Sequence, residues 1–307
     1  MDELMTKRLA IIKQLYKLGV SQSYDSEPIN GFCLLSFHDS VEMFMKLCAE
    51  SKGKKIKRDT SFGDYFREVS GLSGEAEMSN LNNRRVALKH YGSLPSKLDV
   101  EISRVNVTTF FQNNTPTFFN IEFNDISLIS LVKYDSVKEY LQSALDNLNN
   151  GNNESSIINS QIAFKELLFC YEEDKRYQWN SPFKICEDFS FSDSRSLRSI
   201  GLGFDFESFV DKVQKSIINL DNISKVLGFG LDFKKYAKFK IMEPDITVWH
   251  EEGGRTYETM KNDRINYNKK NTEFCFDFVI ESSLKLQEFD FDINELYIAH
   301  ENNKRTS

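Results

Sequence analysis

The chain has 307 residues, a formal net charge of −7 and a hydrophobic content of 40%, to which 26 Phe residues contribute. This apolar content excludes a disordered chain, and the acidic balance argues against a generic nucleic-acid coat. No run of 18 apolar residues occurs, and the N-terminus lacks the apolar segment of a signal peptide. We therefore expect a cytoplasmic protein without membrane contact.

Apolar side chains recur at helical spacing in the first part of the chain. The pattern predicts helices over 3–18, 29–51 and 61–69, and another from about residue 78 to Tyr91. Gly92 suits the left-handed position after this last helix, and Pro95 prevents its continuation. The helix over 29–51 is apolar around most of its circumference, so we expect it to be largely buried.

Helical periodicity continues through the rest of the chain. We predict helices over 99–112, 126–133, 137–148, 154–175, 206–227, 232–242 and 259–286, a turn at 113–116 and a short extended piece at 246–249. The run 118–123 fits either a helical turn or a strand fragment. The sum is an all-α protein made of helical bundles.

The Asn-rich stretch 147–153 is the best candidate for a domain boundary. It divides the chain into a first helical domain, 1–148, and a second helical half, 149–307. A single domain of two packed halves is an equal alternative. Residues 1–100 hold 15 Lys and Arg against 13 Asp and Glu, whereas residues 101–307 hold 24 against 33, so the small basic excess lies in the first part.

The five cysteines are scattered and odd in number, and no pair has the spacing of a CxxC motif: Cys33, Cys48, Cys170, Cys186 and Cys275. We expect buried thiols in a reducing compartment rather than a disulfide framework. No HExxH motif or other metal pattern occurs, and Gly201-Leu-Gly203 lacks the third glycine and the preceding strand of a nucleotide loop. The sequence therefore predicts no metal and no cofactor.

Five cations fall within residues 51–58. Such a run is most often a solvated loop between helices. The alternative is an edge that contacts phosphate, formed by Lys54, Lys55, Lys57 and Arg58.

Arg84, Arg85, Lys89 and His90 fall within seven consecutive positions, the densest cluster of chemistry in the chain. Arginine offers a fixed fork of donors to phosphate oxygens, and histidine can exchange a proton near neutral pH. Arg85 and His90 are five residues apart, about 500° around an ideal helix. A helix start, a distortion or a partner chain would have to bring the two side chains together.

The segment Phe32-x-x-Leu-x-Phe-His-Asp-Ser-Val-Glu42, followed by Leu81-Asn-Asn-Arg-Arg-Val-Ala-Leu-Lys-His-Tyr-Gly92, resembles the HEPN superfamily. The signature of that superfamily is Arg, four to six residues and then His, on or near the start of an α-helix. Arg84 and Arg85 both fit the spacing, and the surrounding phrase favours Arg85. The resemblance covers residues 1–100. It implies a metal-independent endoribonuclease, often a toxin or antiviral effector, that forms a homodimer so that two motifs share one cleft.

This resemblance, together with the chemistry of RNA, assigns roles to the cluster. RNA supplies its own nucleophile, the 2′-hydroxyl, so the enzyme needs a proton acceptor and cationic stabilisation. His90 would act as general acid/base and Arg85 would stabilise the phosphate oxygens, with Arg84 and Lys89 assisting in RNA binding. His38 and Glu42, four residues apart on the buried helix, either form a hydrogen bond at the helix edge or support the site.

Residues 160–168 are similar in pattern to residues 39–47, which suggests a second, degenerate HEPN-like half. Arg195 and Arg198 are followed by no histidine at the required spacing, so this half lacks the motif. Two other classes stay open. One is a non-catalytic helical module that binds RNA, a nucleotide or a protein partner such as an antitoxin, and the other is a purely structural assembly.

Overall fold

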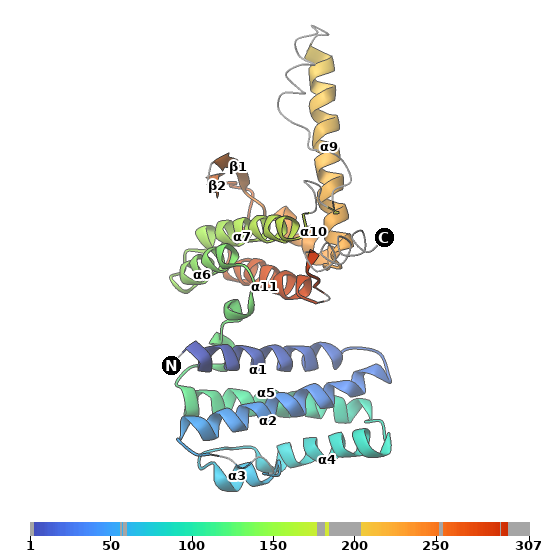
Figure 1. Cartoon of the computed structure of the whole chain (residues 1–307), viewed down its shortest axis with the longest axis vertical. Coiled ribbons are helices and arrows are strands. Elements are labelled where there is room, and N and C mark those ends of the chain that lie inside the picture. Colours follow the sequence, from blue (N-terminus) through green and yellow to red (C-terminus); the bar gives the residue numbers. More distant parts are fainter. Residues whose placement is uncertain are drawn as a thin grey trace, which may run out of the picture. The chain divides into compact units, whose positions relative to one another are not determined.

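The computed structural model describes residues 3–55, 57, 60–176, 182–183, 204–251, 254–288 and 290–293. Within these ranges the protein is all-α, as the periodicity predicts, with one two-stranded hairpin as its only sheet (Figure 1). The chain forms two compact units, residues 1–131 and 132–307, so the boundary differs from the expected one at 148/149. None of the helices in the described ranges is both long and apolar enough to cross a bilayer.

Unit 1 is a helical bundle whose α2 is buried along most of its length. Its helices are α1 (Glu3–Gln22), α2 (Cys33–Ser51), α3 (Asp64–Glu68), α4 (Glu75–Tyr91) and α5 (Lys97–Phe119), with 3₁₀ turns at Ile29–Phe32, Phe123–Asp125 and Ile129–Leu131. Helix α2 contacts α1, α4 and α5, so it organises the bundle. This confirms the prediction of a largely buried helix.

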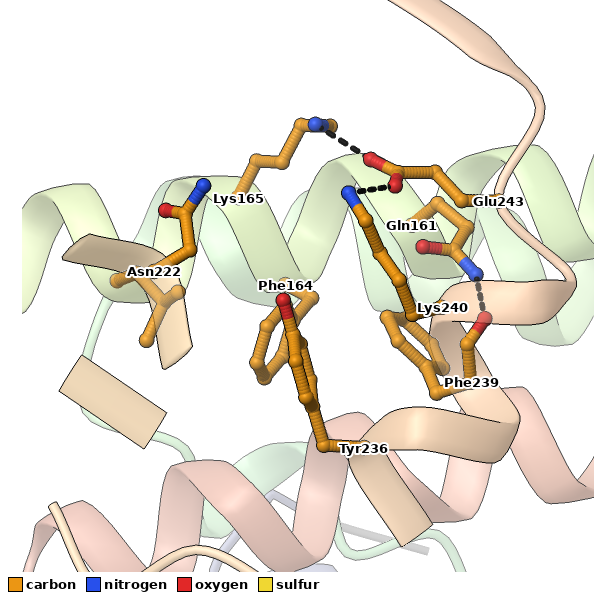
Figure 2. A pocket seen from close by; sticks show the side chains of 9 residues that line it. Gln161, Phe164, Lys165, Asn222, Tyr236, Phe239, Lys240 and Glu243 are labelled. Atoms are coloured by element: carbon orange, nitrogen blue, oxygen red, sulfur yellow. Dashed lines mark hydrogen bonds and ion pairs between the residues drawn. The ribbon is translucent and has the colours of Figure 1, made fainter. Parts of the chain in front are cut away.

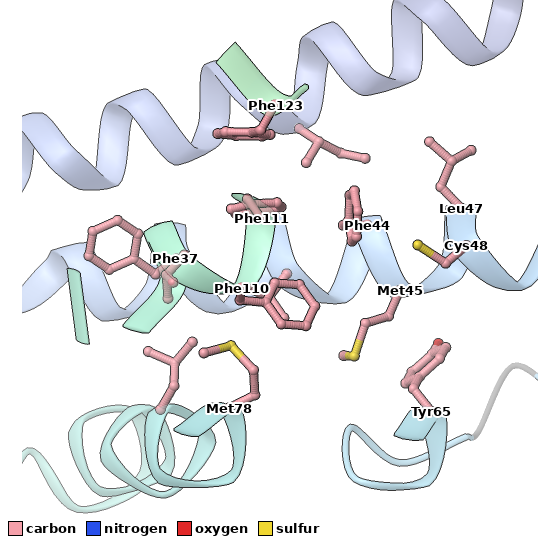
Figure 3. Packing of buried hydrophobic residues seen from close by; sticks show 14 of the residues in the cluster. Phe37, Phe44, Met45, Leu47, Cys48, Tyr65, Met78, Phe110, Phe111 and Phe123 are labelled. Carbon is pink, nitrogen blue, oxygen red and sulfur yellow. The ribbon is translucent and has the colours of Figure 1, made fainter. Parts of the chain in front are cut away.

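Aromatic rings fill the core of unit 1 (Figure 3). Phe44 of α2 meets Phe110 and Phe111 of α5 edge to face, with ring centroids 5.7 and 5.2 Å apart. At the α1–α2 crossing, a Cβ built on Gly19 would lie 2.7 Å from Cδ1 of Phe37. Glycine is therefore required for the helices to approach this closely.

Unit 2 packs three long helices against one another and adds the hairpin. Its elements are α6 (Asp135–Asn149), α7 (Asn153–Asp174), α9 (Phe204–Gly228), α10 (Phe233–Ile241), β1 (Asp245–Glu251), β2 (Gly254–Met260) and α11 (Lys269–Leu286). Helix α7 contacts both α6 and α11. The rings of Phe164, Phe239 and Phe278 meet with centroids 4.7 to 5.3 Å apart and join α10 and α11 to α7.

The predicted turn at 113–116 is wrong, because α5 continues through Pro116 to Phe119. The fully buried Asn114 explains the continuation. Its side chain accepts a hydrogen bond from the Ser73 backbone N–H (2.9 Å) and donates to the carbonyls of Ser73 (3.2 Å) and Phe110 (2.7 Å). The two bonds with Ser73 are tertiary contacts, and they offset the local cost of a proline inside a helix.

Two further predictions are wrong. Residues 126–133 form only the short 3₁₀ turn, because the Lys13 Nζ of α1 binds the carbonyl oxygens of Asn124 (2.7 Å) and Ile126 (2.6 Å). The helix expected over 259–286 begins at Lys269, and residues up to Met260 belong to β2. The expected extended piece at 246–249 is confirmed as part of β1.

Candidate functional site

Helix α4 carries the Arg/His cluster on an unbroken α-helix. It runs from Glu75 to Tyr91, and Gly92 ends it with a left-handed φ of 64°. The Gly92 N–H donates to the Leu88 carbonyl (3.1 Å), which satisfies one of the last orphan carbonyls of the helix. The predicted C-terminus is therefore confirmed, and Lys89 and His90 lie in the last turn.

Leu81, which is buried, defines the core face of α4. Relative to it, Arg85 lies about 40° round the helix on one flank, and His90 about 180° round, on the outward face. His90 is accordingly exposed, whereas Arg85 is half-buried. The two predicted catalytic side chains are thus about 140° apart with no distortion between them, so one chain alone does not bring them into a common cleft.

Arg84 lies on the opposite flank and joins α4 to α5. Its Nε donates to Asp99 Oδ1 (2.9 Å) and its Nη1 to Ser103 Oγ (3.3 Å). Asp99 also belongs to the capping box of α5, in which the Asp99 N–H donates to Ser96 Oγ (3.1 Å) and the Ser96 N–H donates to Asp99 Oδ2 (3.2 Å). Ser96 Oγ also donates to Asp99 Oδ2 (2.7 Å). The hydrogen bond from Ser96 and the charge of Arg84 hold the pKa of Asp99 below its usual range. Arg84 is therefore engaged in holding two helices together.

Arg85 has no such partner for its Nε, which is buried and makes no hydrogen bond within the described residues. A buried donor without an acceptor has a free-energy cost of about 1–3 kcal/mol. Such a group is one that an anionic ligand would satisfy. The spacing rule fitted Arg84 and Arg85 equally well, whereas the structure shows that Arg85 retains donor capacity.

His38 of α2 lies close to this guanidinium. The imidazole is only 3% exposed, stacks on Phe62 with centroids 4.4 Å apart, and places Nε2 3.1 Å from Asn82 Oδ1. Burial lowers the pKa of His38 and the charge of Arg85 lowers it further, while a hydrogen bond with Asp39 opposes both. His38 is thus held neutral at neutral pH.

Glu42 lies on the other side of His38, with its Oε2 4.0 Å from Nδ1. His38, Asp39 and Glu42 could offer a metal ion three ligand atoms that lie within 4.8 Å of one another. Lys46 Nζ is already 2.7 Å from Glu42 Oε1, and the charge of Arg85 reaches His38 as well. Lys46 therefore already pairs with one carboxylate of this cluster, which fits an ion-pair network better than a metal centre.

The basic residues predicted to contact RNA occupy three settings. Lys89 is exposed and lies about 40° from Arg85 on the same flank of α4. Lys54, Lys55 and Lys57 are exposed in the loop after α2, and Lys54 Nζ also donates to the Glu68 carbonyl at the end of α3. Arg58 lies outside the described residues.

Sequence reasoning missed Asn82, Asp39 and Phe62. Asn82 precedes Arg85 by three residues, so helical periodicity alone places both on one flank of α4. That signal was available, and it indicates a polar flank formed by Asn82, Arg85 and Lys89. The stacking of Phe62 on His38 depends on the path of the loop between α2 and α4, which periodicity does not give.

Unit 2 holds a buried charge cluster of a different kind. Arg255 of β2 donates from Nε to Glu166 Oε1 (3.1 Å) and from Nη2 to Glu166 Oε2, and the Tyr257 hydroxyl donates to Oε1 (2.5 Å). Burial tends to raise the pKa of Glu166, but the bonds from Arg255 and Tyr257 hold it below its usual range. These bonds dock the hairpin onto α7.

A small cavity of about 50 Å³ lies between α7, α9 and α10 (Figure 2). Beside this cavity, Lys165 and Lys240 both form ion pairs with Glu243, and Lys165 Nζ lies 2.6 Å from Glu243 Oε1. The Gln161 side chain is held by the Phe239 carbonyl, which accepts from Nε2 at 2.9 Å. The charged groups around this cavity already pair with one another, so they have less capacity to bind a ligand than the unpaired donor on the flank of α4. Arg195 and Arg198 lie outside the described residues.

The cysteines in the described ranges fit the expectation of free thiols: Cys33, Cys48 and Cys275 are buried and Cys170 is partly buried. Cys186 lies outside these ranges. Comparison with known proteins adds no assignment, since no protein-family model, no curated protein and no solved structure matches this chain.

Proposed function

We propose that the protein is a metal-independent endoribonuclease of the HEPN type. The observation that carries this proposal is the contrast between two adjacent arginines of α4. Arg84 is engaged with Asp99 and Ser103, whereas Arg85 keeps a buried Nε without a hydrogen-bond partner in the described residues. A phosphate oxygen would satisfy that donor through a charge-assisted hydrogen bond.

The chemistry uses the RNA's own 2′-hydroxyl. As the 2′-oxygen attacks phosphorus, the imidazole of His90 takes its proton, and the same group in its protonated form returns a proton to the departing 5′-oxygen. The bond from phosphorus to the 5′-oxygen breaks, which leaves a 2′,3′-cyclic phosphate and a 5′-hydroxyl. Arg85 stabilises the charge that develops on the non-bridging oxygens, and Lys89 assists in binding the strand.

The unbroken helix makes a second copy part of this proposal. Because Arg85 and His90 lie on different faces of α4, the reactive pair would consist of Arg85 from one copy and His90 from the other. A homodimer with two-fold symmetry would then contain two such sites.

The test is incubation of the pure protein with single-stranded RNA and excess EDTA. We expect cleavage that survives chelation and falls ~10²- to 10⁴-fold in His90→Ala. An equimolar mixture of refolded Arg85→Ala and His90→Ala chains should recover part of the activity, because mixed dimers regain one complete site. Full cleavage by His90→Ala, or cleavage abolished by EDTA, would contradict the proposal.

A second candidate is a non-catalytic helical module that binds RNA, a nucleotide or a protein partner through the basic flank of α4. One observation favours it: Arg85 lies near the buried His38, which Asn82 contacts, whereas His90 lies about 140° away round the helix. Retention of intact RNA, lost on Arg85→Ala and unchanged in His90→Ala, would support this module. Absence of RNA binding would leave a nucleotide or a protein partner as its target.

The resemblance to HEPN proteins also supports a biological setting. We propose a toxin or anti-phage defence effector that acts on RNA in the cytoplasm, with an antitoxin or another protein partner that controls it. Growth arrest on expression of the wild-type chain, absent with His90→Ala, is the expected result. Equal growth of cells that express either chain would contradict this role.

A further inference from the structure

A groove of about 390 Å³ runs between α1 and α5 of unit 1. This volume lies in the range of about 300–1,000 Å³ that is usual for small-molecule sites. Tyr16, Tyr24, Arg104, Val105, Thr109 and Gln112 are among the residues that line it. The groove lies on the flank of α5 that faces α1, whereas Arg84 of α4 binds the flank that carries Asp99 and Ser103.

The floor of this groove is fixed by hydrogen bonds. The Tyr16 hydroxyl and Thr108 Oγ1 are 2.7 Å apart, and Thr108 Oγ1 donates to the Arg104 carbonyl at 2.7 Å. Tyr16 also meets Phe111 and Phe123 of the core edge to face, with centroids 5.4 and 5.2 Å apart. The floor is therefore preformed rather than created by a ligand.

The rim carries a cation–π pair. The Arg104 guanidinium carbon lies 4.3 Å from the centroid of the Tyr24 ring, and its Nη1 donates to Ser23 Oγ at 3.2 Å. Tyr24 is nevertheless 72% exposed. A large aromatic ring is thus held at the mouth of the groove by a cation on one side and stays accessible to solvent.

The chemistry of these groups selects the ligand. A ring and a guanidinium plane provide stacking surfaces, and the side chains of Gln112 and Thr109 offer donors and acceptors at the edge. Proteins bind the bases of single-stranded nucleic acids by this combination of stacking on aromatic rings or arginine planes and hydrogen bonding at the base edge. A lipid tail would meet too many polar groups here.

We propose that the groove between α1 and α5 binds an unpaired nucleobase of single-stranded RNA, which stacks on the Tyr24–Arg104 pair. This inference rests on the proposed function, since it takes RNA as the substrate, and it adds a subsite away from the reacting phosphate. Because a paired base cannot leave its stack without loss of pairing, the subsite makes the protein select single strands over duplexes.

The test measures binding of a 5′-labelled single-stranded RNA by fluorescence anisotropy, with every variant made in the His90→Ala background so that the strand stays intact. Tyr24→Ala should raise Kd about 10-fold or more, within the range known for loss of one stacked base. Tyr24→Phe keeps the ring and should bind within about 2-fold of its parent. Phe209→Ala, which removes an aromatic side chain 61% exposed on α9, is the matched control and should leave Kd unchanged.

Arg104→Ala should weaken binding in the same direction as Tyr24→Ala, and a duplex of the same sequence should bind more weakly and respond to neither change. Thermal melting of each variant verifies that it is folded. Equal affinity of Tyr24→Ala and its parent for the single strand would overturn the proposal, and so would a lack of binding by the parent. If binding depends on Tyr24 but the wild-type protein does not cleave RNA, the base-binding role of the groove would be supported and the proposed nuclease activity would be refuted.

Discussion

Arg85 in unit 1 and Arg255 in unit 2 are both partly buried cations, each with one fully buried nitrogen that has no hydrogen-bond partner among the described residues, yet their surroundings differ. Glu166 accepts hydrogen bonds from two nitrogens of Arg255, and Nη1 of that guanidinium has no hydrogen-bond partner among the described residues. Arg85 lies near the imidazole of His38, and its Nε has no hydrogen-bond partner among the described residues. A cation whose nitrogens bind a carboxylate holds structure together, whereas one that keeps a buried donor without an acceptor retains its capacity to bind an external anion.

The largest expected effect is on the stability of unit 2. Glu166→Ala would leave Arg255 buried without its counter-charge, and breaking a pair of this kind typically costs about 3–5 kcal/mol. Urea unfolding should reveal this loss. Glu273→Ala, which removes the partner of the exposed Lys269 at 3.8 Å, is the matched control and should change stability by less than about 0.5 kcal/mol. If both substitutions changed the free energy of unfolding equally, the Glu166–Arg255 pair would have no special role in the stability of unit 2.

The next effect separates activity from stability at Arg85. Arg85→Ala should lower the RNA cleavage rate by about 10²–10³-fold, since it removes a donor to the developing charge. Its urea midpoint should not fall below that of the wild type, because no hydrogen bond to Nε is lost and the cost of a buried donor without an acceptor is removed. Arg84→Ala is the control. It should lower the urea midpoint, because its hydrogen bonds to Asp99 and Ser103 are lost, and it should keep the cleavage rate within about 10-fold of the wild-type rate. The reverse result, with activity lost at Arg84, would exchange the roles of the two arginines.

A smaller effect measures how much Arg84 contributes to structure. The side chains of Arg84 and Asp99 are both partly exposed, so water and salt screen their attraction. A double-mutant cycle with Arg84→Ala and Asp99→Ala should give a coupling free energy of about 0.2–1 kcal/mol. A coupling near zero would mean that Arg84 too is available to a ligand.

The smallest expected effect is a pH dependence that originates at His38. Burial lowers its pKa in the folded protein, so below the usual value of about 6.5 the unfolded chain binds the proton more readily than the folded one. Stability should therefore fall as pH drops from about 6.5 toward the lowered pKa. His38→Gln should flatten that part of the curve of unfolding free energy against pH. An unchanged slope would show that other groups cause it.

Much of unit 1 could be predicted from sequence because the signals are local. Apolar periodicity gave the buried helix over 29–51 and the all-α class, and Gly92 with Pro95 gave the end of α4. The elements that were wrong depend on distant partners. Asn114 is held by Ser73 across the bundle, and Lys13 of α1 holds the backbone that would otherwise form a helix after α5.

In the candidate site, too, the features that depend on neighbouring residues in the sequence could be predicted, and those that depend on contacts with other helices could not. The spacing of Arg and His located α4, but it could not distinguish Arg84 from Arg85, because that choice depends on a carboxylate in the capping box of α5. Nor could it reveal that His38 approaches Arg85 from another helix. Only the first strand of the hairpin was predicted. In β2, Arg255 and Tyr257 both point toward Glu166, which is the period of two of a strand, and an interpretation in terms of helices overlooks this period.

Gly19 has a bearing on the groove although it lines no part of it. An alanine there would push against the Phe37 ring, and that ring lies 6.1 Å, centroid to centroid, from Tyr16 in the groove floor. A single methyl group at this helix crossing would therefore change the shape of the adjacent groove through the Phe37 ring. The shape of the groove therefore depends in part on a residue that does not line it.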